Sequence, residues 1–462
     1  MRKSLLAVAL AFAFPTAFAQ SNVTLYGIVD VGVEYLDVGS LSSTRLASGI
    51  SQGSRWGIRG TEVLGGGYSA VFTLESRFSI DTGSVTNNNS VYWCRPAGST
   101  ANPVCPGVTV FQGPAVALPP THPLRVGVAG LQNTLNDTLL SQLTTVNSAG
   151  ALFDRQAYAG LVTPYGAVIG GRQYTPGYEI INKYSVLGDQ TALQFGQGYN
   201  TPQIRANNAL QYRAELKGFT LSLMYGFGGS EANRSERAVP PTDGDDFMGG
   251  NVQYNTSNWG VGLGYNRTNV VPYATQAAGT PTQKTGLQQI NLGGWMGFGS
   301  VKVYAQWNHR ENDNPVLTPT DIQNLIVSTG GNLTAITGIL GGLNLHPHDM
   351  DLMRGFAGPT DSDAYHLGAS WTIGNHVLYG VYNYGKDKAR SAWATEDASA
   401  SHFGAAYFYN FSRRTALYAV AAFMKNSDQS RMSLSSAGYT TGWTTGAGED
   451  ATALQLGLRH MF

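Results

Sequence analysis

The sequence predicts an all-β protein, a 16-stranded antiparallel transmembrane β-barrel with short periplasmic turns and long extracellular loops. Segments of about ten residues alternate between apolar and polar side chains, and the connections between them alternate between short and long. Charged residues make up only 13% of the chain, whereas Gly occurs 58 times and aromatic residues make up 11%. This combination is typical of many strands that have one face in lipid and the other in water.

Composition also excludes other classes of protein. The 462 residues are enough for two or three ordinary domains or for one large barrel. The mean hydropathy of -0.14 is too polar for a helical membrane protein. After the N-terminal leader, no apolar run approaches the roughly 18–20 residues that a spanning helix needs. The formal net charge of zero gives no argument for nucleic-acid binding.

Residues 1–19 have the features of a secretory signal peptide. Arg2 and Lys3 precede an apolar run over residues 5–14, and residues 17–19 (Ala-Phe-Ala) form a small-x-small cleavage site. We therefore expect cleavage after Ala19 and a single barrel domain over residues 20–462.

The last segment, residues 451–462, is the clearest strand. Its side chains alternate between an apolar face and a mixed or polar face. The apolar face consists of Leu454, Leu456, Leu458, His460 and Phe462. A soluble protein rarely leaves such a face uncovered, but the face is suited to lipid. We expect this strand to close the barrel by pairing with the first strand.

The first three strands are predicted over residues 23–35, about 52–61 and 68–80. In the first strand, valines and Leu25 share the outward face, and Asp30 and Glu34 lie on the inward face. In the second and third strands, alternation places three arginines inward: Arg55, Arg59 and Arg77.

The rest of the chain repeats this pattern. Further strands are predicted over about residues 153–161, 166–172, 205–215, 219–228, 247–255, 259–269, 286–297, 301–310, 364–373, 376–385, 402–411 and 416–425. Long connections span residues 81–150, 174–204, 229–245, 270–285, 311–362 and 427–449. Residues 81–150 are interpreted as one long surface loop in which residues 131–146 are compatible with a short helix.

Aromatic side chains cluster near the predicted strand ends, where amphipathic rings meet the lipid–water boundary. They are Tyr26, Tyr35, Trp56, Tyr68, Trp259, Trp307, Trp371, Tyr409, Phe411 and Phe462. Because Tyr and Trp are frequent in strands of every kind, this cluster supports a barrel only together with the loop pattern.

Cys94 and Cys105 are the only cysteines. They lie in a Pro/Gly/Ser-rich segment of a chain with a secretory leader, and exported proteins fold in an oxidising compartment. We expect a local disulfide that constrains a loop, with two free thiols as the alternative.

Several motifs in this chain are similar to the general porins of Gram-negative bacteria, of the type found in β-proteobacteria. The motifs occur in order along the whole mature chain. They are residues 23–30 (VTLYGIVD), 53–62 (GSRWGIRGTE), 64–67 (LGGG), 74–76 (LES), 153–161 (FDRQAYAGL), 170–173 (GGRQ), 205–212 (RANNALQY) and Phe462.

This resemblance implies a homotrimer in the outer membrane that passes small hydrophilic solutes and ions by passive diffusion, without a cofactor. It implies a third long loop folded into the lumen, and a Phe462 that the outer-membrane assembly machinery recognises. Outer-membrane lipid and lipopolysaccharide are the expected surroundings. The loops at 81–150 and 311–362 are longer than expected for the family, so they could cap the mouth or latch a neighbouring protomer.

Sixteen strands enclose a lumen too wide for side chains to fill, so a loop is needed to narrow it. Residues 174–204 are the best candidate, and they contribute two acids, Glu179 and Asp189. The inward arginines of the early strands form the opposite, basic wall: Arg55, Arg59, Arg77, Arg172, Arg205 and Arg213. Because guanidinium stays protonated and charged rings set ion preference, a mild anion preference is predicted.

A structural role for these arginines is the alternative, in which some of them pair with carboxylates and rigidify the barrel. The available carboxylates are Asp30, Glu34, Glu62, Glu75 and Glu215.

No catalytic motif or complete metal site is recognised, so no enzyme activity, cofactor or metal is predicted. Residues 346–349 (His-Pro-His-Asp) lack a full ligand set, and residues 243–246 (Asp-Gly-Asp-Asp) lack EF-hand spacing. Three alternatives to a diffusion channel stay open: a substrate-specific channel, a surface receptor or adhesin acting through the long loops, and an outer-membrane enzyme such as a phospholipase.

Overall fold

The structure is a computed structural model. It describes residues 22–39, 42–83, 95–97, 102–104, 152–188, 191–194, 204–227, 247–270, 285–312, 360–388, 396–430, 432–436, 440–443 and 448–462.

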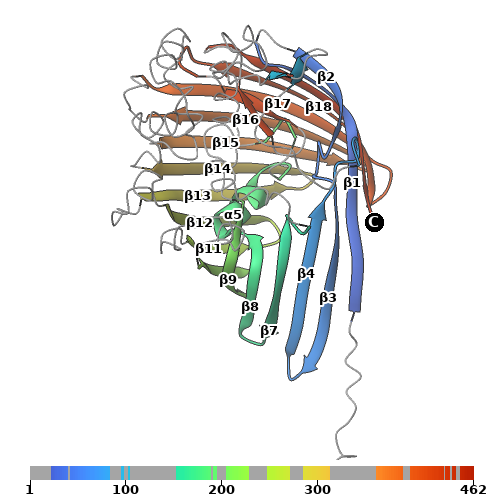
Figure 1. Cartoon of the computed structure of the whole chain (residues 1–462), viewed down its shortest axis with the longest axis vertical. Coiled ribbons are helices and arrows are strands. Elements are labelled where there is room, and N and C mark those ends of the chain that lie inside the picture. Colours follow the sequence, from blue (N-terminus) through green and yellow to red (C-terminus); the bar gives the residue numbers. More distant parts are fainter. Residues whose placement is uncertain are drawn as a thin grey trace, which may run out of the picture.

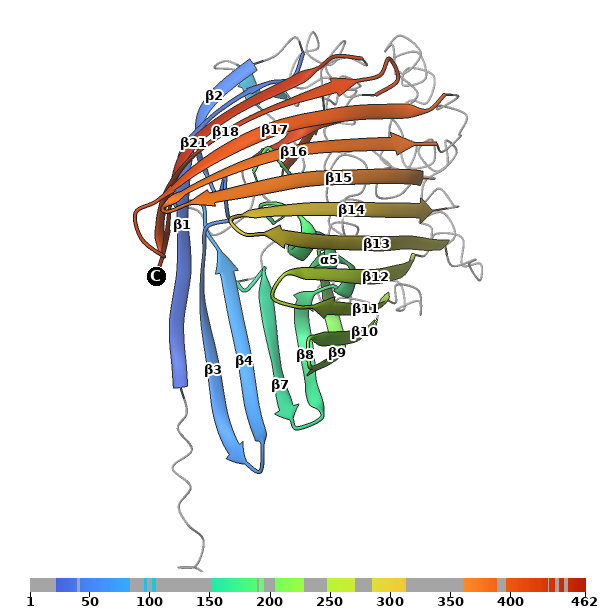
Figure 2. The same cartoon turned by 180° about the vertical axis from the view of Figure 1, so that it is seen from behind.

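The main sheet closes on itself as an antiparallel barrel. Neighbouring wall strands follow one another in chain order, and the last strand, β21 (Ala451–Met461), pairs with the first, β1 (Asn22–Asp37). Figures 1 and 2 show the strands curving around the helix α5 (Pro176–Tyr184). The other wall strands are β3 (Arg55–Gly65), β4 (Tyr68–Arg77), β7 (Gln156–Thr163), β8 (Gly166–Tyr174), β9 (Arg205–Leu216), β10 (Phe219–Gly226), β11 (Phe247–Asn255), β12 (Trp259–Val270), β13 (Thr285–Phe298), β14 (Val301–Asn312), β15 (Thr360–Ile373), β16 (His376–Asp387), β17 (Ala398–Asn410) and β18 (Thr415–Asn426). The predicted 16-stranded barrel and its closure by the terminal strand are confirmed.

The second strand position is longer than predicted because it is made of two pieces. β2 (Ser42–Ser48) pairs with the second half of β1, and β3 pairs with the first half. Residues 49–54 leave the sheet between them, and the Asp30 carboxylate accepts hydrogen bonds from the backbone N–H groups of Ile50, Ser51 and Gln52 at 2.9–3.2 Å. The inward Asp30 therefore stabilises this break between β2 and β3. Period-two alternation alone does not predict such a break.

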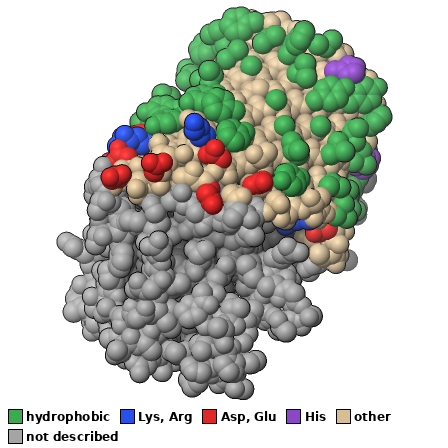
Figure 3. All heavy atoms as spheres, turned by 90° about the horizontal axis from the view of Figure 1, so that it is seen from above, with side chains coloured by type: hydrophobic (Ala, Val, Ile, Leu, Met, Phe, Trp, Pro, Cys, Tyr) green, Lys and Arg blue, Asp and Glu red, His purple; other side chains and the backbone are tan. Residues whose placement is uncertain are grey.

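The two faces of the wall have the predicted chemistry. On β1 and β21, Val33 and Leu456 are exposed by 48% and 55%, whereas the inward Asp30 and Glu34 are fully buried. On the face that Figure 3 shows, hydrophobic side chains are spread over the described surface, and acidic and basic side chains gather along its border with the residues drawn in grey. This distribution suits a wall that faces hydrocarbon outside and water inside.

Short turns join the strands at one rim (Figure 2). Several of them require a positive φ angle, which Gly adopts without strain. Gly66 and Gly67 make the β3–β4 turn, Gly299 the β13–β14 turn and Gly374 the β15–β16 turn. Two small hairpins lie outside the main sheet: β5 (Arg95–Ala97) with β6 (Asn102–Val104), and β19 (Met432–Ser436) with β20 (Thr440–Trp443).

One expectation needs correction, and several others concern residues outside the described part of the chain. Tyr26 does not belong to the aromatic belt, because it faces inward and donates its phenol O–H to Glu75 Oε2 at 3.1 Å. The leader, the possible helix at 131–146 and most of the loops at 81–150 and 311–362 lie outside the described residues. In the part of the chain that the structure describes, no helix is long and apolar enough to cross a membrane.

Candidate pore constriction

The loop between β8 and β9 contains the helix α5, which the sequence reading did not predict. Thr175 is its N-cap and accepts a hydrogen bond from the Tyr178 backbone N–H at 3.3 Å, and Pro176 occupies the first turn. Glu179 in the first turn and Lys183 in the last turn suit the helix dipole. The Thr-Pro start followed by apolar residues at helical spacing was the available signal.

Helix α5 packs on the inner face of β11–β14, where glycines make room for it. A Cβ atom on Gly262 or Gly293 would lie 2.7 Å from the Tyr184 side chain. Wall amides bind the polar groups of the helix ends: Asn266 Oδ1 accepts from Gly177 N–H at 3.0 Å, and Gln306 Nε2 donates to the Ile181 carbonyl at 2.9 Å. The helix therefore narrows the lumen from one side and has its end groups satisfied by the wall.

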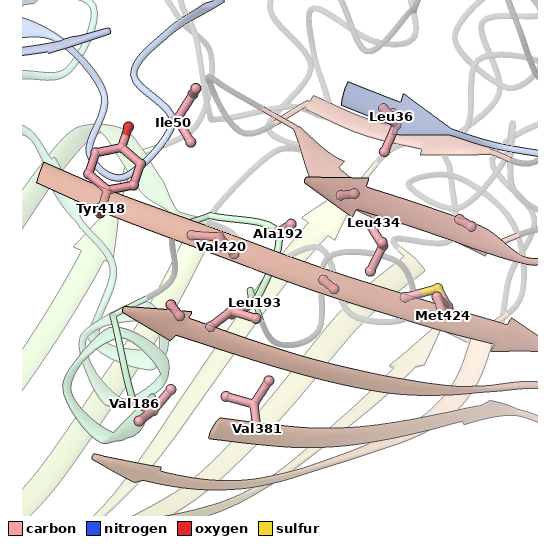
Figure 4. Close-up of a cluster of buried hydrophobic side chains, with 14 of the residues drawn as sticks. Leu36, Ile50, Val186, Ala192, Leu193, Val381, Tyr418, Val420, Met424 and Leu434 are labelled. Atoms are coloured by element: carbon pink, nitrogen blue, oxygen red, sulfur yellow. The ribbon is translucent and has the colours of Figure 1, made fainter. Parts of the chain in front are cut away.

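The chain after α5 continues along the inner wall as a short segment, residues 186–188 and 191–194, which we call the strap. Val186, Ala192 and Leu193 join a buried apolar cluster with inward side chains of β16–β18, including Val381 and Val420 (Figure 4). The Ala192 backbone N–H donates to Gln455 Oε1 on β21 at 3.0 Å. The third long loop thus lines the inner wall from β11 to β21.

The wall from β3 to β9 carries a basic cluster, most of which is buried. It carries five arginines and two carboxylates in one network: Arg55, Arg77, Arg155, Arg172 and Arg205, with Glu75 and Asp154. Arg155 donates Nε–H to Glu75 Oε1 at 2.7 Å, and both residues are buried. Guanidinium groups stay protonated at neutral pH, so five cations lie together on this side of the barrel.

Tyr174 at the end of β8 connects this network to the constriction loop. Its phenol oxygen accepts hydrogen bonds from Arg155 at 3.0 Å and Arg205 at 3.2 Å. The Arg205 guanidinium also lies 4.7 Å from the centre of the Tyr174 ring, and that ring stacks on Tyr178 in the first turn of α5. The position of the helix is therefore linked to the position of the arginines.

The remaining predicted arginines are arranged differently. Arg213 on β9 forms ion pairs with Glu179 of α5 and with Glu215, each at 3.0 Å, so two carboxylates offset its charge. Arg59 is exposed on the inner face of β3, and its guanidinium lies 5.2 Å from the centre of the Tyr26 ring. The pairing alternative applies to Arg55 with Glu75 and to Arg213 with Glu215.

Lys183 in the last turn of α5 is a further cation of the constriction, and it was not predicted. Its Nζ donates to Gln253 Oε1 on the wall at 2.8 Å. Burial and the neighbouring Arg213 lower the pKa of Lys183 below its ordinary value, although Glu215 and Glu179 oppose this shift. Lys183 therefore loses its proton more readily than a lysine in water.

Sequence reasoning also missed Arg155, Asp154 and Tyr174. Arg155 and Asp154 lie in the predicted strand beginning at residue 153, but in the structure they precede β7. Their side chains turn inward and bind β4 partners that are about 80 residues away, Glu75 and Arg77. A local alternation pattern does not show such a contact.

Phe462 follows β21 and exchanges two backbone hydrogen bonds with Gly27 of β1, at 3.0 and 3.1 Å. A Cβ atom on Gly27 would lie 2.2 Å from the Phe462 ring, so the ring crosses the first strand at a glycine. Asp189, Cys94, Cys105 and residues 243–246 and 346–349 lie outside the described residues.

One trio of metal-type ligands occurs among the described residues, at His309, Asp361 and Asp363 near the ends of β14 and β15. The Asp363 carboxylate is already bound by protein groups, because it accepts from Trp307 Nε1 at 3.0 Å and from Lys388 Nζ. The binding of a metal there would require Lys388 to leave, so we assign the trio no metal.

A closed barrel with an apolar exterior, a polar interior and an inward helix opposite a charged wall defines a membrane channel. The family model described as Gram-negative porin matches residues 5–429. The chain belongs to the Gram-negative porin family, and this membership confirms the resemblance inferred from the sequence motifs.

Individual relatives agree with this family. Outer membrane porin protein 32 of Delftia acidovorans is 26% identical over 477 aligned residues that cover 100% of both chains. An outer membrane porin protein of Bordetella pertussis is 40% identical over 108 residues, which are 20% of this chain and 28% of that protein.

Solved structures show the same fold. An anion-selective porin from Comamonas acidovorans superposes with a TM-score of 0.63 at 24% identity, covering 96% of this chain and 100% of that one. The trimer form of OmpT from Vibrio cholerae gives a TM-score of 0.55 at 13% identity, covering 96% and 99%.

These findings place the chain in the Gram-negative outer membrane as a multi-pass β-barrel that forms a passive diffusion channel. The family consists of channels, so the enzyme alternative is set aside, and the receptor alternative is not favoured.

Proposed function

We propose that this porin prefers anions, and that the basic wall opposite α5 determines this preference. Arg55, Arg77, Arg155, Arg172 and Arg205 gather on this wall around Glu75 and Asp154. A positive field in a narrow, low-dielectric passage raises the local concentration of anions and repels cations. The porin of the same fold from Comamonas acidovorans, which is described as anion-selective, supports this proposal.

The exposed Arg59 adds to the same field. It lies on the inner face beside Tyr26, one strand from Glu75. Glu179 and Asp189 are proposed as the opposing loop acids, and Glu179 acts mainly on Arg213, with which it forms an ion pair. The anion preference is therefore mild, because the loop acids offset part of the positive field, to which Lys183 adds.

The test is the reversal potential of the purified channel in a salt gradient across a planar bilayer. Wild type should give the sign of anion preference, and Arg172→Gln with Arg205→Gln should move the potential toward zero. Lys425→Gln is the matched control, because Lys425 is exposed on the outer face of β18. Cation preference of the wild type would refute the proposal, as would a double variant that behaves like the control.

We also propose that the chain is a homotrimer. The trimer form of a porin of the same fold supports this proposal. Closure in three equal steps under voltage, and a trimer mass in detergent, are the expected results; a single step and a monomer mass contradict them.

The proposed outer-membrane partners are lipopolysaccharide around the barrel and the assembly machinery at Phe462. We expect Phe462→Ala to lower the amount of assembled barrel in cells while the purified variant still folds in detergent. Equal assembly of this variant and wild type would contradict the role of Phe462.

Two processing steps are proposed for the mature chain. Cleavage after Ala19 is tested by N-terminal sequencing, which should begin at Gln20, and another start refutes it. The Cys94–Cys105 disulfide is tested by thiol alkylation before and after reduction, and labelling without reduction refutes it.

A further inference from the structure

Two inward histidines occur in the same short pattern on alternate strands. His366-Leu367-Gly368 lies on β15 and His402-Phe403-Gly404 lies on β17. Because strand side chains alternate, each histidine shares the inner face with the glycine two residues later. Both histidine side chains are buried, at 3% exposure.

The two glycines form seats for the strap. A Cβ atom on Gly368 would lie 2.8 Å from Val186 Cβ, and one on Gly404 would lie 2.0 Å from Leu193 Cδ2. A larger side chain at either position would therefore displace the strap from the wall. Figure 4 shows Val186 and Leu193 on the strap, close to Val381 of the wall.

The two histidines and Asn383 of β16 bind the same strap through a directional series of hydrogen bonds. The Val186 backbone N–H donates to His366 Nε2 at 3.3 Å, so Nε2 is unprotonated and the ring proton is on Nδ1. His366 Nδ1–H then donates to Asn383 Oδ1 at 2.6 Å.

The other half of the series is equally constrained. The Asn383 amide nitrogen donates to His402 Nδ1 at 2.8 Å and to the Leu193 carbonyl at 3.4 Å. His402 Nδ1 is therefore an acceptor as well. All three side chains are buried, and the series is consistent only with both imidazoles neutral.

We propose that His366, Asn383 and His402 are positioning residues that hold the strap on the wall, and that acid releases it and lowers conductance. A second proton on His366 places an N–H against the Val186 N–H. A second proton on His402 places an N–H against the Asn383 amide. Either event leaves two donors facing each other in a buried site, which is costly.

Other titratable groups lie on the inner faces of the packed strands. Among the described residues they are Lys302, Tyr304 and Arg310 on β14, Tyr379 and Asp387 on β16, Tyr418 on β18, Arg459 on β21, and Asp30 and Glu34 on β1, which bind Tyr418 and Gln455. The strap itself contributes the backbone groups of Val186, Ala192 and Leu193. Because both imidazoles are buried and hydrogen-bonded as neutral rings, release of the strap requires acid.

The inference rests on the channel function but not on the anion preference. The test is single-channel conductance as the pH is lowered from about 7.5 to about 3, a range that extends well below the ordinary histidine pKa. Wild type should lose conductance reversibly in acid. The double variant His366→Gln with His402→Gln, which has no group to protonate there, should lose this response. His376→Gln is the matched control, because His376 is exposed and far from the strap in sequence and contacts; it should respond like wild type.

Gly404→Val should have low conductance already at neutral pH, because it displaces Leu193 permanently. A second readout does not need conduction: peptides containing Val186 and Leu193 should exchange amide hydrogens faster in acid than strand peptides, after correction for intrinsic rates. A wild-type conductance that is constant with pH, an unchanged acid response in the double variant, or equal protection at both pH values overturns the proposal. Absence of any channel at neutral pH would instead contradict the diffusion function.

Discussion

Glu179 on α5 and Arg213 on β9 form an ion pair at 3.0 Å that joins the constriction helix to the wall strand following it in the chain. Both side chains are partly exposed, so the pair contributes little to stability, about 0–1 kcal/mol. Its importance is electrostatic, because Glu179 together with Glu215 offsets the charge of Arg213. The pair therefore limits how positive the lumen becomes.

Glu179→Gln should strengthen the anion preference, because one of the two carboxylates on Arg213 is removed while the guanidinium remains. The expected result is a larger reversal potential of the anion-selective sign in a salt gradient. Glu62→Gln is the control. Glu62 is exposed on β3, so this substitution removes the same charge at a different place. A potential equal to that of this control would contradict the role of Glu179.

Arg155→Met should destabilise the barrel by up to about 3–5 kcal/mol, because the buried Glu75 carboxylate loses its 2.7 Å partner, although Arg55 at 3.5 Å still offsets part of its charge. Urea-dependent unfolding in lipid vesicles measures this change. Arg59→Gln removes an exposed guanidinium from the same wall and should change stability little. Similar unfolding midpoints for the two variants would show that the buried pair is not a stabilising contact.

Gly293→Val should lower single-channel conductance, because a side chain there meets Tyr184 Cβ at 2.7 Å and pushes α5 into the lumen. Gly380→Val is the comparison, since a Cβ atom on Gly380 meets nothing within 4 Å. If both variants conduct like wild type, the seat of α5 on β13 does not determine the width of the passage.

Leu456→Lys should impair the closing strand, because Leu456 is 55% exposed on the face that lies in lipid. Lysine on the lipid face costs about 2–4 kcal/mol near the middle of the bilayer. The measurement is the folded fraction in lipid vesicles as urea is varied, with Leu456→Phe as the apolar control. Equal stability of the two variants would mean that this face does not contact hydrocarbon.

The anion preference should weaken as the pH rises toward the ordinary pKa of lysine. The pKa of Lys183 is lowered by burial and Arg213, so its charge is lost before that of a lysine in water. The pKa of Lys183 is lower in the folded chain than in the unfolded chain, so protonated Lys183 destabilises the fold. The free energy of unfolding therefore increases as the pH rises through the pKa of the folded chain. Reversal potentials measured at increasing alkaline pH report the charge.

The control for this pH dependence removes the group itself. Lys183→Gln should abolish the alkaline change, whereas Lys425→Gln should keep it, because Lys425 is on the outer face. An alkaline change of equal size in both variants would assign it to other groups.

The sequence alone predicted most of the barrel, because period-two alternation is a local property of each strand. The exposed Leu454, Leu456 and Leu458 opposite the inward Gln455 are an example. Closure of the barrel was predicted from the same pattern, and β21 pairs with β1. The third long loop was predicted as the constriction by its order in the chain, and its described residues pack on the inner wall.

Tertiary structure decided which inward groups meet. Arg155 binds Glu75, Arg213 binds Glu179, and the two His-x-Gly patterns bind a strap that lies nearly 200 residues away in sequence. Alternation says only that these side chains face the lumen. Whether a charge there is free, paired or buried depends on the path of the loop across that lumen. Long-range packing on particular wall glycines sets this path. No local sequence pattern distinguishes these glycines from the other glycines of the strands.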